Sequence, residues 1–342
     1  MKFRFHVSRL ANLFFFVSNL SEWSPYCRKE YNHEWLKQKH LQQSEREALK
    51  HVRNILWKHK TLGRYFFRTE QEAWRNIAKK LSKREYEALC ASFAVFLPRF
   101  SALWKEEKSN LQNIAAAFSR GTSSPVNKTL IELSTLYAPH RKPRSITTIF
   151  LLTSPITKRL VSGGGKITSK ILALECSKTT AKNNIHDLFV RVLLHELVHT
   201  MFEDRIKNII RTCLQSKGFS SIKRELARSA VYRETLSFAG PIKEMVAISL
   251  LPEGYLAERY FNANVSKSLL QRNSVRECRL KHTYYDLMLF ATWELLPIAR
   301  EYSTQKKPID ARYLREVIMV WRQFNRTNLS RWDLEKRTRS VS

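Results

Sequence analysis

The first 120 residues carry apolar side chains at three- and four-residue spacing, with Lys, Arg, Glu and Gln between them. An α-helix places such positions on one face, so this pattern is typical of helices that bury one side. We therefore predict a helical N-terminal region over residues 1–120. The spacing is clearest in residues 35–49, 52–57, 70–81, 85–104 and 111–118.

The helical pattern breaks between residues 121 and 144. Two stretches that contain Gly, Ser or Pro, residues 121–125 and 138–143, flank a short helix-like segment at 128–136. Residues of these types favour turns and loops. We therefore assign residues 121–144 to a linker.

Two short apolar segments rich in β-branched residues follow. Residues 145–153 (SITTIFLLT) and 167–176 (ITSKILALEC) each predict a strand. Three consecutive glycines stand between them at 163–165, without the spacing of a phosphate-binding loop. They indicate a hairpin or a β-bulge beside a binding cleft.

The helical pattern returns in the second half of the chain. Residues 189–201 (FVRVLLHELVHTM) are largely apolar and contain no Pro or Gly, which predicts a buried helix. Residues 242–251 predict a second apolar helix, which Pro252 and Gly254 end. We expect an α+β protein, mainly helical, with a small β-sheet packed on the 189–201 helix. The predicted divisions are a core over 145–260, a C-terminal helical region over 261–328 and a frayed basic tail over 329–342.

The 189–201 helix contains the pattern H-E-x-x-H, as His195, Glu196 and His199. Residues four apart lie on the same face of a helix, so both imidazoles can reach one metal ion. Neutral imidazole binds zinc well, and a carboxylate beside the ion can take a proton from water. A chance match in a chain of this composition has a probability on the order of one or two per cent. The structural alternative is two core histidines bonded to backbone carbonyls.

A third metal ligand is expected from a glutamate further along the chain. Glu244 is the first candidate, because a carboxylate on an apolar helix is costly unless it is paired or binds a metal. Glu234, in a more polar setting beside Arg233, is the second, and Glu225 follows. Ligating histidines also need partners for their other nitrogen, and Glu203, Asp204 or a backbone carbonyl can provide them.

The order of strand, glycine-rich turn, strand and H-E-x-x-H helix resembles the catalytic core of the zincin metallopeptidases. No H-x-x-G-x-x-H pattern follows the motif, so the chain looks more like the gluzincin branch, in which a later helix supplies a glutamate ligand. The resemblance covers about residues 146–260. It implies Zn²⁺ held by His195, His199 and Glu244, with Glu196 as the general base of peptide-bond hydrolysis.

The same resemblance implies two further features of a peptidase. An extended substrate would add to a strand at 146–153 or 167–174, as substrates do at zincin edge strands. A Tyr or His would stabilise the oxyanion opposite the metal. The candidates for this role are Tyr255, Tyr260, His282, Tyr284 and Tyr285.

The composition is strongly basic, with 60 Lys and Arg against 30 Asp and Glu and a formal charge of +30. Such a charge favours anionic partners, such as acidic peptides or nucleic acid. It is spread along the whole chain, as a general basic bias would also produce. Two alternatives therefore stay open: a basic helical nucleic-acid-binding protein with structural histidines, and a zincin-fold binding module without catalysis.

The cysteines and the N-terminus bear on localisation. Five separated cysteines without a C-x-x-C pattern suggest reduced thiols in the cytoplasm. The apolar residues 10–17 resemble the core of a signal peptide, which would imply secretion, but Arg9, Asn12 and Ser18 interrupt the apolar stretch. An amphipathic helix packed into the fold is the favoured interpretation. We expect no transmembrane segment, because the N-terminal apolar run is too short.

Overall fold

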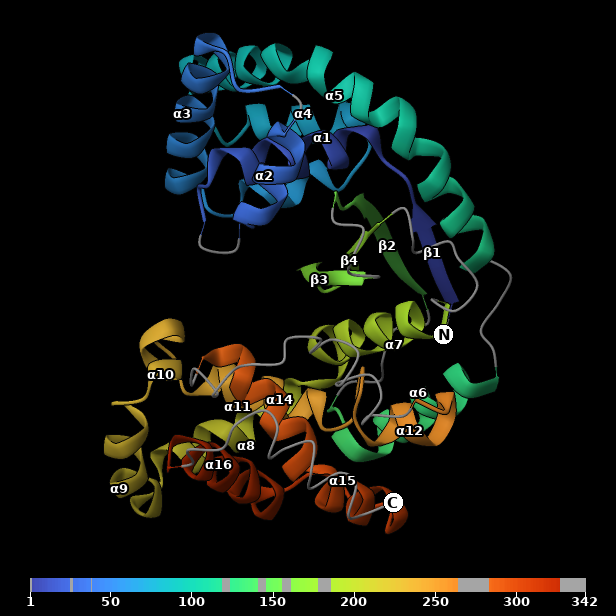
Figure 1. The fold of residues 1–342 in the computed structure, drawn as a ribbon, viewed down its shortest axis with the longest axis vertical. Helices are drawn as coiled ribbons and strands as arrows, with labels where there is room; N and C mark the ends of the chain where they lie inside the picture. Colours follow the sequence, from blue (N-terminus) through green and yellow to red (C-terminus); the bar gives the residue numbers. More distant parts are fainter. Residues whose placement is uncertain are drawn as a thin grey trace. The chain divides into compact units, whose positions relative to one another are not determined.

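A computed structural model describes residues 2–24, 27–37, 39–118, 124–140, 146–155, 161–177, 186–263 and 283–326 (Figure 1). These residues form two compact units. Unit 1 comprises Met1–Gly121 and Ser145–Phe189, and unit 2 comprises Thr122–Arg144 and Val190–Ser342. Helices dominate and one small mixed sheet accompanies them, which confirms the mainly helical α+β class.

The helices of unit 1 occupy most of the predicted N-terminal region. Helix α1 contains the apolar residues 10–17 and is almost wholly buried, so the predicted helix packed into the fold is confirmed. The elements are α1 (Arg9–Ser21), α2 (Lys29–Leu36), α3 (Gln43–Lys58), the 3₁₀-helix η1 (Leu62–Phe66), α4 (Glu70–Ala78) and α5 (Lys83–Phe118).

Helix α5 is 36 residues long. It is the one helix in the described ranges that is long and apolar enough to cross a membrane by length and composition alone. Its buried residues, among them Leu89, Phe93, Phe96 and Phe100, form a stripe along a helix that contacts α1 and α3. The absence of a transmembrane segment therefore stays a prediction.

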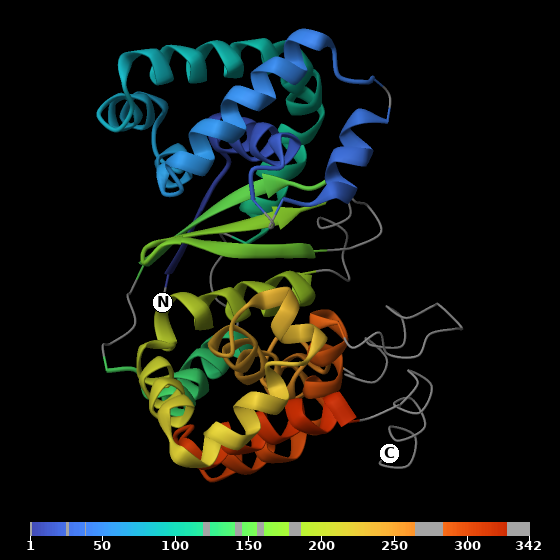
Figure 2. The ribbon, with the colours of Figure 1, turned by 90° about the vertical axis from the view of Figure 1, so that its left-hand side faces the viewer.

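The sheet of unit 1 has the strand order β1-β2-β4-β3. Strands β1, β2 and β4 are parallel, and β3 is antiparallel to β4. Figure 2 shows β2, β3 and β4 side by side. The strands are β1 (Lys2–His6), β2 (Ile146–Thr153), β3 (Val161–Thr168) and β4 (Ile171–Cys176).

Strand β1 corrects the prediction of an all-helical region over residues 1–120. The sequence KFRFH alternates polar and apolar side chains, which is a strand period, but five residues are too few to make that signal clear. What makes the segment a strand is its parallel pairing with β2, from Lys2 opposite Ile146 to His6 opposite Phe150. That partner lies far along the chain.

The predicted hairpin and bulge are both present, although the turn lies elsewhere than at the glycines. Strands β3 and β4 are joined through Ser169 and Lys170, and the three glycines lie inside β3. The register shifts between Val161 and Gly164, where Gly163 has φ of +131°. A glycine adopts this backbone conformation without the strain that a side chain would add.

The prediction that an extended substrate adds to the strand at 146–153 or 167–174 is wrong, because the main strands of both segments lie inside the sheet. Strand β2 lies between β1 and β4, and β4 lies between β2 and β3, so both have paired neighbours on each side. The edge strands of the described sheet are β1 and β3. Of the residues predicted to bind an extended peptide, only residues 167 and 168 belong to an edge strand.

Helix α1 is tied to the sheet through Asn12, which is fully buried. Its side-chain amide donates to the carbonyl of Leu151 at 3.0 Å, and its oxygen accepts the N–H of Thr153 at 2.8 Å. These bonds satisfy backbone groups of β2 that water cannot reach. The aromatic rings of Phe14 and Phe16 continue this core towards η1 and α5.

All secondary-structure elements in the described residues of unit 2 are helices. Part of the predicted linker forms α6, and the described part of the predicted C-terminal region is helical as expected; residues 329–342 lie outside the described ranges. The predicted 145–260 core is divided, with its strands in unit 1 and residues 190–260 in unit 2. The elements are α6 (Ser124–Tyr137), α7 (His186–Leu197), the π-helix η2 (Val198–Phe202), α8 (Asp204–Gln215), α9 (Lys217–Leu226), α10 (Ala230–Thr235), α11 (Ala239–Ile248), α12 (Tyr255–Phe261), α14 (Tyr284–Glu294), α15 (Leu296–Thr304) and α16 (Ala311–Arg326).

A buried ion pair joins α3 to α5 in unit 1. Arg99 donates from Nε and Nη2 to the two carboxylate oxygens of Glu45, each at 2.8 Å. Glu45 also accepts the N–H of Gln42 at the start of α3. The hydrogen bond from Arg99 lowers the pKa of Glu45, and burial opposes this by raising it.

We expect Glu45→Gln to lower the free energy of unfolding by about 3 kcal/mol at neutral pH, because the Arg99 guanidinium loses its buried partner. The folded-state pKa lies below the ordinary value of 4.5. The contribution of the ionised Glu45 is therefore fully present above that value and is lost as the pH falls through the folded-state pKa. Urea unfolding followed by circular dichroism at several pH values would measure the difference between variant and wild type. The difference should shrink on acidification.

The matched control is Glu47→Gln, at an exposed residue of the same helix whose side chain accepts a hydrogen bond from Gln43. It should change stability little at any pH. A Glu45→Gln deficit that stays constant from neutral to acidic pH would contradict the role of the Arg99 pair.

Candidate metal centre

Three segments of unit 2 bring the H-E-x-x-H residues and Glu244 together. His195 and Glu196 lie near the end of α7, His199 lies in η2, and Glu244 lies on α11. The predicted buried helix is present, but it changes from α to π geometry after Leu197. Single π turns inside helices are rare and occur often at functional sites.

Apolar packing positions these segments. Leu194, Leu197 and Val198 are fully buried beside the histidines, and so are Met245 and Val246 beside Glu244. Helix α11 contacts α8, α14 and α16, which places it in the middle of the helical packing. The cluster is therefore carried by rigid, buried elements rather than by loops.

The polar atoms of the cluster converge on one point. His195 Nε2 lies 3.1 Å from Glu244 Oε1, and His199 Nε2 lies 3.1 Å from Glu244 Oε2. The two Nε2 atoms are themselves 3.1 Å apart. Nitrogen ligands of a tetrahedral zinc ion, each about 2.0–2.1 Å from it, are separated by about 3.3 Å. The spacing of these atoms therefore fits a shared metal ion.

The other nitrogen of each imidazole has an acceptor. His195 Nδ1 lies 2.9 Å from the carbonyl oxygen of Leu251, and His199 Nδ1 bonds the carboxylate of Glu203. In the neutral tautomer whose proton is on Nδ1, each imidazole donates from Nδ1–H to its acceptor. The lone pair on Nε2 then points towards Glu244 and the other imidazole. Lone pairs and a carboxylate at this spacing repel one another unless a cation lies between them. The donor set thus suits a metal.

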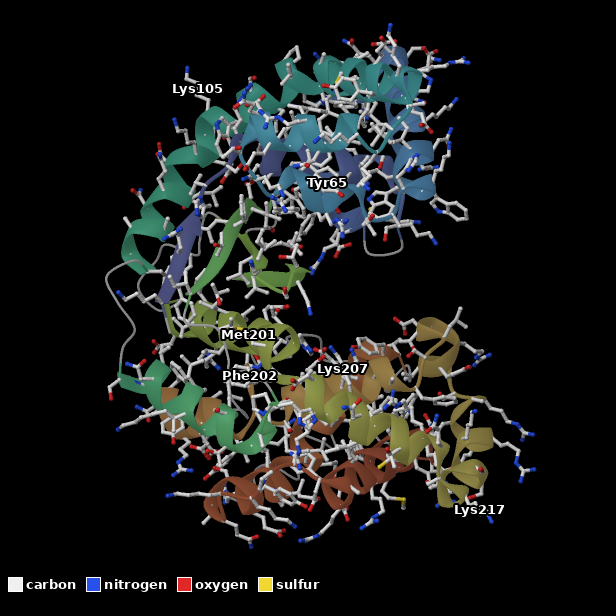
Figure 3. The ribbon with its side chains drawn as sticks, turned by 180° about the vertical axis from the view of Figure 1, so that it is seen from behind. Tyr65, Lys105, Met201, Phe202, Lys207 and Lys217 are labelled. Atoms are coloured by element: carbon white, nitrogen blue, oxygen red, sulfur yellow. The ribbon has the colours of Figure 1, made fainter. Side chains whose placement is uncertain are left out.

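These contacts settle which second partners the histidines have. Glu203 and a backbone carbonyl, both expected as candidates, take these places. Asp204 instead accepts the N–H of Arg205. Glu203 is itself held by two ammonium groups, because Lys207 Nζ (labelled in Figure 3) lies 3.3 Å and Lys243 Nζ 3.7 Å from its Oε2.

The protonation equilibria show the same preference for positive charge. Burial lowers the pKa of His199, but the hydrogen bonds to Glu203 and Glu244 raise it to about 10. Burial also lowers the pKa of His195, but the charge and hydrogen bond of Glu244 raise it, and the net shift is upward. Burial raises the pKa of Glu244, yet the two imidazoles hold it well below its usual range. The cluster favours a bound cation.

The cluster is partly exposed to solvent. The side chain of Glu244 is 27% exposed and that of His199 is 19% exposed, whereas that of His195 is 9% exposed. Glu244 and His199 are therefore the two members of the cluster that solvent reaches most.

Glu196 lies beside the cluster, as its place in the motif requires. Its side chain is half-buried, and its charge acts to raise the pKa of His195. Its backbone carbonyl accepts the hydroxyl of Thr200 at 2.9 Å across the start of η2. Its role as general base stays a prediction.

The other glutamates considered as a third ligand lie in different surroundings. Glu225 pairs with Arg322 and Arg326. Glu234 accepts the N–H of Tyr284 at 2.9 Å. Among the three candidates only Glu244 joins His195 and His199, and these three residues form the one such cluster of potential metal ligands found in the described ranges.

The residues considered for oxyanion stabilisation are not selected by the structure. Tyr260 donates its hydroxyl to Glu132, and the ring of Tyr255 lies against Arg259 and Arg300. His282 and the side chain of Tyr285 lie outside the described residues.

Tyr137 is a residue near the cluster that the sequence did not indicate. It is fully buried, and its hydroxyl has no hydrogen-bond partner in the described part of the chain. Burial raises its pKa well above the ordinary value, and the charges of Glu203, Tyr313 and Glu244 raise it further. Its ring lies 6.3 Å from that of Phe202 in η2. No local signal distinguishes it from an ordinary core tyrosine at the end of a helix.

Comparisons of the chain with protein-family models, curated proteins and solved structures find no match. What can be stated of its class is a mainly helical α+β protein with a His-His-Glu cluster on buried helices. Inference about function therefore rests on the cluster itself.

If the cluster holds Zn²⁺, Glu203→Gln should weaken its binding about 10- to 100-fold, because His199 loses the charged acceptor that orients its ring. Competition with a chromogenic chelator, with zinc quantified by elemental analysis, would measure the change. The matched control is Glu225→Gln, which removes the same charge elsewhere in unit 2 and should leave zinc affinity unchanged. Equal affinity of the Glu203 variant and the wild type would remove Glu203 from the site.

Proposed function

We propose that this protein is a zinc-dependent metallopeptidase with a gluzincin-like site. The observation that supports this most is the mutual 3.1 Å approach of two Nε2 atoms and the Glu244 carboxylate, with an acceptor on each Nδ1. Three protein ligands are typical of catalytic zinc, because the fourth position stays open to water or substrate. Structural zinc sites usually have four protein ligands.

The residues divide the chemistry among them. His195, His199 and Glu244 would hold Zn²⁺, which supplies polarisation of the scissile carbonyl and a lowered pKa of water. The Leu251 carbonyl and Glu203 keep the imidazoles in the ligating tautomer. Glu196 takes the proton of the attacking water and passes it to the leaving amine.

The finer fold, substrate and location belong to the same proposal. The chain order of strands β2, β3 and β4 followed by the motif helix is the order expected of a zincin-like core. The formal charge of +30 favours acidic peptides as substrates. Cys27, Cys90, Cys176 and Cys213 are free thiols, which suits a reducing cytoplasm.

We expect about one zinc per chain in elemental analysis of the purified protein, and loss of that zinc in His195→Ala. Glu196→Gln should keep the metal but lose about 10²- to 10⁴-fold in peptide hydrolysis, because the amide cannot take a proton. Mass spectrometry of products from an acidic peptide mixture would measure the rate. Glu258→Gln, an exposed change on α12, serves as the control with the same loss of charge.

Each half of this experiment can refute a different part of the proposal. A wild-type protein that takes up no zinc after reconstitution overturns the metal site. A Glu196→Gln variant that retains zinc and hydrolyses peptides at the wild-type rate removes Glu196 from the mechanism. Zinc binding without hydrolysis in the wild type favours the non-catalytic binding module.

A second candidate function, nucleic-acid binding, has one specific observation in its favour. On unit 1, Trp57 is 66% exposed with the ammonium of Lys60 5.5 Å from its ring centroid. Nearby in sequence, Tyr65 (Figure 3) has the Arg64 guanidinium 5.0 Å from its ring centroid. The hydrogen bond from Arg64 lowers the pKa of Tyr65, as do the charges of Lys80 and Arg68. Aromatic rings flanked by cations can stack on bases and attract the phosphates beside them.

If this surface binds single strands, Trp57→Ala should weaken binding of a labelled oligonucleotide by about 1–3 kcal/mol, because one base loses its stacking partner. Fluorescence polarisation at several salt concentrations would measure it, with and without a zinc chelator. Met319→Ala, which removes an exposed apolar side chain of unit 2, is the control. Binding that is indifferent to Trp57 would exclude this surface, and loss of binding with chelator would connect it to the metal.

A further inference from the structure

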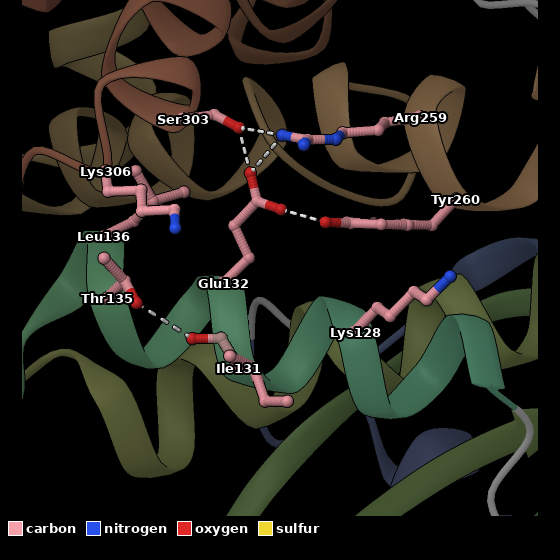
Figure 4. A pocket seen from close by; sticks show the side chains of 9 residues that line it. All are labelled: Lys128, Ile131, Glu132, Thr135, Leu136, Arg259, Tyr260, Ser303 and Lys306. Carbon is pink, nitrogen blue, oxygen red and sulfur yellow. Dashed lines mark hydrogen bonds and ion pairs between the residues drawn. The ribbon is translucent and has the colours of Figure 1, made fainter.

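Unit 2 contains a pocket on one face of α6, and none of its lining residues belongs to the His195–His199–Glu244 cluster (Figure 4). Its volume is about 270 Å³, just below the range of about 300–1,000 Å³ that is typical of small-molecule sites. Helix α6 supplies one wall, α12 supplies Arg259 and Tyr260, and the end of α15 with the turn after it supplies Ser303 and Lys306. The lining residues from α6 are Lys128, Ile131, Glu132, Thr135 and Leu136.

Glu132 organises the floor of this pocket. Its Oε1 accepts Arg259 Nη1 at 2.9 Å and the hydroxyl of Ser303, and its Oε2 accepts the hydroxyl of Tyr260. Burial, together with the bond to Glu132, raises the pKa of Tyr260 to about 12, so the hydroxyl stays a donor. The carboxylate is therefore satisfied by three donors that it holds in place.

The remaining charged groups of the pocket are the cations of Arg259, Lys128 and Lys306, which keep donors available for a ligand. The guanidinium of Arg259 uses only Nη1 in hydrogen bonds within the described chain, which leaves Nε and Nη2 as donors. The ammonium groups of Lys128 and Lys306 have no acidic partner among the described residues. Three cations against the single Glu132 carboxylate leave a net charge of two positive units.

An apolar wall completes the pocket. Ile131 is 69% exposed although it is a large aliphatic residue, and Leu136 lines the same cavity. A ligand with an uncharged carbon frame could cover Ile131 while its anionic groups meet the lysines.

We propose that this pocket binds a small organic dianion, a phosphate monoester or a dicarboxylate, through Lys128, Lys306 and the free edge of Arg259. The net charge of the lining matches two negative charges, and a cavity of about 270 Å³ suits a small molecule. The site involves none of the residues of the metal cluster, so it stands independently of the proposed peptidase function.

Isothermal titration of the full-length protein with inorganic phosphate, and separately with succinate, tests the proposal and distinguishes the two ligand sources. We expect saturable binding in at least one titration. Lys128→Gln and Lys306→Gln should each weaken it about tenfold, because each removes one charge-assisted hydrogen bond. Both lysines are exposed, so neither substitution disturbs the core.

Lys217→Gln is the matched control, since Lys217 is an equally exposed lysine of unit 2 outside the pocket (Figure 3). It should bind the anion as the wild type does. Binding of phosphate alone assigns a phosphate monoester, and binding of succinate alone assigns a dicarboxylate. No saturable binding in either titration, or an equal loss in all three variants, overturns the proposal. None of these outcomes depends on zinc or on hydrolysis.

Discussion

Compensation of charge around Glu244 is the constraint on which the arrangement of unit 2 depends. A carboxylate on an apolar helix such as α11 is stable only when opposite charge or hydrogen-bond donors surround it. His195 and His199 provide that surrounding at 3.1 Å each, and Glu203 adds a second carboxylate behind His199. Two acids and two imidazoles in a space of this size favour a cation, which a proton or a metal ion can supply.

The helices around the cluster are shaped by this requirement. The change from α7 to the π-helix η2 falls between His195 and His199, the two residues whose rings contact the Glu244 carboxylate. Glu203 in turn lies against the ammonium groups of Lys207 and Lys243, which are partly exposed, so positive and negative groups alternate from the cluster to the surface. Each charge in this series has a neighbour of opposite sign, so the cluster and the fold around it stabilise each other.

Helix α6 connects the metal cluster with the anion pocket. It contacts η2, and the charges of Glu203 and Glu244 raise the pKa of its last residue, Tyr137. Lys128 and Glu132 of the same helix line the pocket together with α12 and α15. An anion bound in the pocket would therefore contact a helix that also packs against η2, the segment that carries His199.

The sequence by itself determined the features that depend on local spacing. The helical character of most of the first 120 residues and strand β2 follow from periodicity and residue type, although the chain leaves the helical conformation between α2 and α3, inside the predicted stretch 35–49. His195 and His199 share a helix face because they are four residues apart. Only the tertiary structure decided the features that join distant residues. It separated Glu244 from Glu234 and Glu225, added Tyr137, paired β1 with β2 and placed β2 and β4 inside the sheet. The physical reason is that periodicity records which face of an element is buried, whereas the partner of that face is chosen by packing between segments that the sequence does not place side by side.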